Sequence, residues 1–82
     1  MSGIKVKDTN GQTLGWVAID PSGAVRLHGF SETLGVLHKS PRKNGGWIVE
    51  NRDLVITGRA TRAEALRWLW ECREARLTAA GR

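Results

Sequence analysis

Gly15-Trp16-Val17-Ala18-Ile19 is the stretch that decides the predicted fold, because a similar stretch, Gly46-Trp47-Ile48-Val49-Glu50, occurs downstream. Each is followed by a turn, a second apolar stretch and a hydroxyl residue suited to cap a helix, Ser31 in the first case and Thr61 in the second. A Gly-Trp strand, a hairpin and a helix therefore occur twice in the pattern, which predicts two packed ββα-like units. The two copies align only with gaps, so the pattern leaves open whether a true duplication underlies them.

The first unit is predicted to cover residues 4–40 and to begin with a three-stranded antiparallel meander over residues 4–30. Alternating apolar residues are interrupted there by two turn sequences, Asp8-Thr9-Asn10-Gly11 and Asp20-Pro21-Ser22-Gly23. The next element is more ambiguous. Residues 32–38 are predicted as a short helix, with a fourth strand over the same stretch as the alternative because a glycine interrupts it.

The second unit, residues 46–77, is predicted to contain two strands and the helix that closes the domain. Thr61-Arg62-Ala63-Glu64 has the pattern of a capping box, which places the start of a helix at residue 62 and its end near residue 77. The rest of the chain, 78–82, is expected to fray. The expected core stripe of this helix, flanked by Trp68 and Trp70, consists of Ala65, Leu66, Leu69 and Cys72.

These elements predict an α+β fold, in which an antiparallel sheet of about five strands packs against a C-terminal amphipathic helix. The 82 residues suffice for a single small domain, residues 1–82. The one cysteine cannot form an internal disulfide, and no apolar run approaches the roughly 20 residues of a membrane span. We therefore expect a cytoplasmic protein that does not insert into membranes.

The sequence gives little support for catalysis. His28 and His38 stand apart without the companions that a metal site needs, and no nucleophile elbow or phosphate-binding glycine motif occurs. Cys72 lies on the apolar stripe of the predicted helix, where an inert core thiol is expected. The chain is accordingly predicted to be a non-enzyme without a metal or a cofactor.

Charge points to a polyanionic partner. Thirteen Lys and Arg against eight Asp and Glu give a net charge of +5. Strand alternation places several cations and one indole on the sheet face opposite the helix. A basic loop follows the first unit and adds further positive charge that could contact phosphates. The sequence therefore predicts a small DNA- or RNA-binding module without distinguishing the two, and the candidate contact residues are Lys5, Lys7, Trp16, Arg26, His28, Lys39, Arg42 and Lys43.

Two other interpretations stay open. Four tryptophans in 82 residues are typical of a protein-binding surface, which favours a compact adaptor or inhibitor of the accessory kind that phages and mobile elements encode. A third interpretation is self-association, with the Trp-rich helix forming the seam of a homodimer. The candidate partner-binding residues lie where the helix is expected to extend beyond the sheet: Trp70, Arg73, Arg76 and Leu77.

Overall fold

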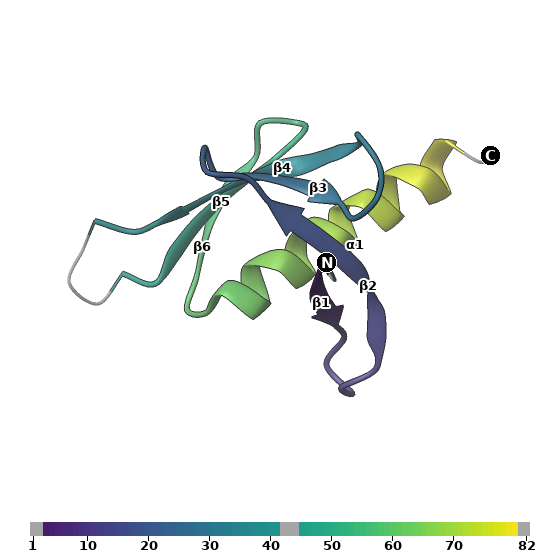
Figure 1. The fold of residues 1–82 in the computed structure, drawn as a ribbon, viewed down its shortest axis with the longest axis horizontal. Coiled ribbons are helices and arrows are strands. Elements are labelled where there is room, and N and C mark those ends of the chain that lie inside the picture. Colours follow the sequence, from purple (N-terminus) through teal and green to yellow (C-terminus); the bar gives the residue numbers. More distant parts are fainter. Residues whose placement is uncertain (1–2, 42–44, 81–82) are drawn as a thin grey trace.

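The computed structural model describes residues 3–41 and 45–80, and it forms one antiparallel sheet with one helix (Figure 1). Strand order in the sheet equals chain order, so each strand pairs with its sequence neighbours. The elements are β1 (Ile4–Lys7), β2 (Thr13–Ile19), β3 (Ala24–Leu27), β4 (Thr33–Lys39), β5 (Trp47–Asn51), β6 (Ile56–Arg59) and α1 (Arg62–Ala80).

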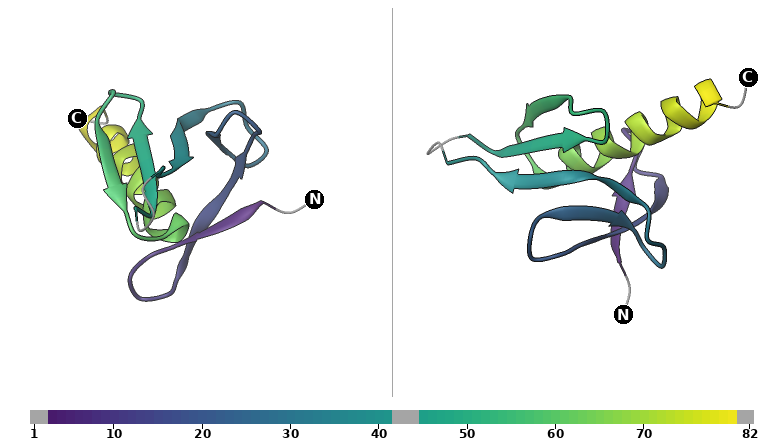
Figure 2. Two further views of the ribbon diagram at one scale, coloured as in Figure 1. Left: turned by 90° about the vertical axis from the view of Figure 1, so that its left-hand side faces the viewer. Right: turned by 90° about the horizontal axis from the view of Figure 1, so that it is seen from above.

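The sheet is curled like half a barrel, and α1 lies on its inner side (Figure 2). The helix contacts β1 at one edge of the sheet as well as β4, β5 and β6, so it bridges the two ends of the meander. Apolar side chains of the inner face meet the helix there. The buried hydrophobic residues are Val6, Val17, Val25, Leu34, Leu37, Val49, Ala65, Leu66, Leu69 and Trp70.

Three of the hairpin turns have the same construction. In the β1–β2 turn the carboxylate of Asp8 accepts hydrogen bonds from the N–H groups two and four residues later, both at 2.9 Å. Asp20 makes the same two bonds in the β2–β3 turn, and the side-chain oxygen of Asn51 makes them in the β5–β6 turn. In each turn the residue three positions later has a positive φ, and it is Gly11, Gly23 or Leu54 respectively.

Two strand glycines let the helix approach the sheet closely. A Cβ atom on Gly15 would overlap the Trp70 ring, and one on Gly35 would lie 2.7 Å from Cδ2 of Leu69. Both glycines are on the inner face, where a side chain would push the helix outward. In the Gly15-Trp16 pair of β2, the glycine therefore lets the helix pack closely against the inner face, while the tryptophan is exposed on the outer face.

The C-terminal helix confirms most of what the sequence predicts for it. The N–H of Glu64 donates to Oγ1 of Thr61 at 3.1 Å, which is the expected cap. Ala65, Leu66 and Leu69 are buried, and Cys72 is half-buried beside them. The helix continues to Ala80, three residues beyond the predicted end, so the part of the expected frayed tail that the structure describes is helical.

The prediction of a short helix over residues 32–38 is wrong, because Thr33–Lys39 is strand β4. A helix there would separate the two hairpins, whereas the observed strand pairs with β3 on one side and β5 on the other. The two predicted ββα-like units are thereby merged into a single six-stranded meander, and the predicted number of about five strands is one too low. The α+β class and the single C-terminal helix packed on the sheet are confirmed.

Candidate nucleic-acid interface

The outer face of β1–β3 carries most of the cationic and aromatic residues that the alternation predicts. Val6, Val17 and Val25 point inward and are at most 1% exposed. Side chains of the intervening positions therefore point outward. We call this surface the β1–β3 outer face, and the candidate residues on it are Lys5, Trp16 and Arg26, with His28 directly after β3. Lys7 lies opposite Thr13, past the register shift that follows Val6, so simple alternation does not place it on this face.

A row across three chain segments forms the centre of this face. Lys5 of β1 lies directly opposite Trp16 of β2. On the other side of Trp16, the N–H of His28 donates to the Trp16 carbonyl oxygen at 3.0 Å. The Trp16 side chain is 44% exposed although it lies on a regular strand. A cation, an indole and an imidazole thus follow one another across the strands.

Arg26 is less available than the lysines because it forms an ion pair. Its guanidinium lies 3.5 Å from a carboxylate oxygen of Asp20, and half of its side chain remains exposed. The Ser22 hydroxyl donates to that carboxylate at 2.6 Å. This bond, the N–H groups of Ala24 and Ser22, and the Arg26 charge lower the pKa of Asp20. Within residues 3–41 and 45–80, neither Lys5 nor Lys7 makes such an ion pair.

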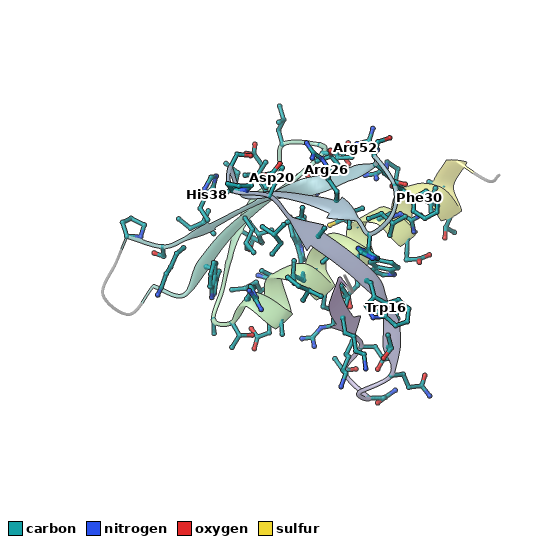
Figure 3. All side chains as sticks on the ribbon, viewed as in Figure 1. Trp16, Asp20, Arg26, Phe30, His38 and Arg52 are labelled. Atoms are coloured by element: carbon teal, nitrogen blue, oxygen red, sulfur yellow. The ribbon has the colours of Figure 1, made fainter. Side chains whose placement is uncertain are left out.

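Sequence reasoning missed a second exposed aromatic ring near this face. Phe30 is the last residue of the meander predicted over residues 4–30, but β3 ends at Leu27 and a turn with Gly29 at a φ of 82° follows. The Phe30 side chain is 69% exposed, and it borders an open hollow of about 520 Å³ together with Arg26, Gly29, Ser31 and Thr33. Figure 3 shows Trp16 and Phe30 on the same right-hand side of the molecule, with Arg26 beside Asp20. Gly29, directly before Phe30 in the sequence, is the residue from which this turn could have been predicted.

The structure separates Lys39 from the other candidate residues. Lys39 ends β4 opposite Trp47, and it shares its side of the strand with inward-pointing Leu37. Its exposed side chain therefore belongs to the helix side of the sheet, beyond the core, and not to the β1–β3 outer face. Arg42 and Lys43, the other two candidates from the basic loop, lie outside the described residues.

The candidate partner-binding residues of α1 do not form the exposed patch that the sequence suggests. Trp70 is only 7% exposed because its ring fits against Gly15, so the expectation of an exposed Trp70 is wrong. The Nε atom of Arg73 lies 3.0 Å from Glu32, and Arg76 lies 4.0 Å from the same carboxylate. The Arg73 guanidinium also lies over the Trp70 ring, 5.4 Å from its centroid. Of these four residues, Leu77 is the most exposed apolar one, at 48%.

The described part of the chain contains no group of three or more His, Cys, Asp or Glu residues that could hold a metal ion. Its helix is also too polar to span a membrane. Cys72 accepts a weak hydrogen bond from the side-chain amide of Asn51 at 3.5 Å. The non-enzyme prediction stays a prediction, since none of these contacts tests it.

Comparison of the chain with protein-family models, with curated proteins and with solved structures gave no match. The arguments for function below therefore depend on this molecule's own surfaces.

Proposed function

We propose that this protein is a small nucleic-acid-binding module that contacts the phosphate backbone with the β1–β3 outer face. The observation that carries the proposal is the row in which Lys5 lies opposite Trp16, with His28 next to it. Lysine ammonium groups neutralise phosphates and release counterions, and an exposed indole can stack on a base. Neither property is needed to hold the sheet together, because the opposite face supplies the core.

Phe30 and the hollow beside it extend this surface. An aromatic ring that is 69% exposed on a short turn contributes little to the core, whereas a flat apolar ring next to Arg26 suits an unpaired base and its phosphate. The backbone of the Gly29 turn leaves this hollow open to solvent. We therefore include Phe30 with Trp16 as the stacking residues of the proposed site.

A salt titration tests the proposal. Binding of single-stranded DNA, duplex DNA and RNA would be followed by fluorescence anisotropy at several salt concentrations. Lys5→Gln is expected to lower the slope of log K against log salt by about 1. Lys39→Gln is the matched control, since it removes the same charge from the other side of the sheet and should leave the slope unchanged.

Aromatic stacking is tested separately. Trp16→Ala and Phe30→Ala are each expected to weaken binding of single strands by about 1–3 kcal/mol if the rings stack on bases. Thermal unfolding of both variants checks that the lost affinity does not come from lost stability. Wild-type protein that shows no salt-dependent binding to any of the three nucleic acids would refute the proposed function.

A further inference from the structure

The two edges of the sheet differ in a way that points to a second copy of this chain. β1 is one edge, and it carries Lys5 and Lys7 together with a register irregularity between Val6 and Lys7. Lysines and bulges are the devices that keep edge strands from pairing with other strands. β6, the other edge, reads Ile56-Thr57-Gly58-Arg59 and pairs with β5 in regular register.

Backbone groups of β6 face away from the sheet at two positions. The N–H of Asn51 donates to the carbonyl oxygen of Val55 at 3.0 Å, while the Val55 N–H donates to the Asn51 side chain, so these two residues occupy a hydrogen-bonded position of the ladder beside the turn. Pairs in an antiparallel ladder alternate, which makes Glu50 and Ile56 a non-hydrogen-bonded pair, and Ile48 and Gly58 as well. The N–H and C=O groups of Ile56 and Gly58 therefore point outward. Among the described residues, no strand lies on that side to receive them.

We propose that β6 pairs with β6 of a second copy in antiparallel fashion, so that the two sheets form one continuous sheet in a homodimer. A twofold axis at Thr57 brings Ile56 opposite Gly58 of the second copy. Each of these two equivalent pairs exchanges two backbone hydrogen bonds, four in all. In two of them the N–H of Ile56 replaces the Arg59 guanidinium, which donates to the Gly58 carbonyl oxygen at 2.8 Å in the monomer. The edge is thus complementary to itself in its hydrogen-bonding pattern.

Side chains of β6 fit the same register. Ile56 is 62% exposed, and in the dimer it lies beside a glycine of the second copy. Apart from its two chain neighbours, the nearest atom to a Cβ built on Gly58 is the Trp47 carbonyl oxygen at 3.9 Å, so the sheet itself leaves space there. The Ile56 side chain can therefore pack over the Gly58 backbone of the second copy, as larger side chains do next to glycines in strands. The two Thr57 residues face each other, which is a favourable cross-strand pair.

The turn before β6 adds an independent observation. Leu54 is 76% exposed and Val55 is 51% exposed, so with Ile56 they form three consecutive exposed apolar residues. Leu54 also has a φ of 66° at a position where the two sister turns carry glycine. A strained and exposed leucine is costly in a monomer. In the proposed dimer this apolar turn lies beside the seam that β6 forms.

Analytical ultracentrifugation without nucleic acid tests this dimer. Over about a hundredfold range of concentration, the wild-type mass is expected to rise from 9.0 kDa to twice that value. Ile56→Lys places a charge on the edge, and Gly58→Val fills the space that receives Ile56. Each is expected to weaken self-association at least about tenfold, equivalent to 1.4 kcal/mol, while leaving the fold and its circular dichroism unchanged.

Leu77→Lys is the matched control, because it also replaces an exposed apolar residue by lysine but lies on α1. It should leave the association unchanged. A wild-type protein that stays at 9.0 kDa throughout would overturn the proposal. So would a dimer that Leu77→Lys disrupts and the two β6 variants do not, since its seam would be the helix. Capture of a different protein by a wild-type chain that remains monomeric would equally refute it.

Discussion

Replacing Leu54 by glycine should stabilise the monomer, although the substitution removes a large apolar side chain. A left-handed backbone costs a non-glycine residue about 1–2 kcal/mol, and Leu54 has a φ of 66°. Glycine relieves that strain but loses about 0.5–1 kcal/mol more conformational entropy on folding. Because the side chain is 76% exposed, little burial is lost. The net gain is expected to lie between about 0 and 1.5 kcal/mol, and its midpoint of about 0.75 kcal/mol raises Tm by roughly 3–6 °C for a domain of this size.

The reverse substitution provides the control. Gly11 has a φ of 82° in a turn of the same construction, and no atom lies within 4 Å of a Cβ built on it. Gly11→Leu should therefore destabilise the protein by a similar amount for conformational reasons alone. Both variants would be measured by urea denaturation at concentrations low enough to keep the chain monomeric. A loss of stability in Leu54→Gly would refute the reasoning, since it would mean that the leucine makes stabilising contacts within the monomer.

Four further outcomes are expected. Thr61→Ala should cost about 1 kcal/mol by removing the helix cap, and Leu69→Ala about 2–5 kcal/mol by leaving a cavity; a neutral Leu69→Ala in chemical denaturation would contradict the core assignment. Cys72, half-buried beside Asn51, should react slowly with a thiol reagent in the folded state and faster in urea. Labelling of the folded protein at the rate of a free peptide would show that the helix is oriented differently. Hydrogen bonds from Ser22 and Ala24 lower the pKa of Asp20, so its carboxylate stabilises the fold above the unfolded pKa of about 4 and loses this effect as the pH falls through the folded value. The difference in unfolding free energy between wild type and Asp20→Asn should therefore shrink in acid. A difference that does not depend on pH would contradict this prediction.

The parts of the fold that sequence reasoning reached are those set by local pattern. Alternation of Val17 and Trp16 on β2 predicted the inward and outward faces, and Thr61 with Glu64 predicted the start of the helix. Each of these signals depends on residues that are close in sequence. Lys5 of β1 and Arg26 of β3 came together on one face for the same reason.

The errors concern contacts between distant segments. Ser31 resembles a helix cap in isolation, but β3 and β5 supply partners for both edges of β4, and this pairing outweighs the local preference. Trp70 was expected on the surface because the helix was expected to extend beyond the sheet there. The absence of a side chain at Gly15, more than fifty positions earlier, gives its ring a place inside. A single sequence does not directly indicate the pairing of β4 with both neighbours or the packing of Trp70 against Gly15.

The order of the elements along the chain has a consequence for how the protein folds during synthesis. Neighbouring strands pair with one another, so each hairpin can form as soon as it leaves the ribosome. The inner face of the sheet, however, is covered by residues of α1, which are made after all six strands. Until then Val6, Val17 and Val49 have no helix against which to pack. We therefore expect a chain truncated after Arg59 to lack a cooperative thermal transition, and completion of the helix to convert a loose meander into a folded domain in one late step.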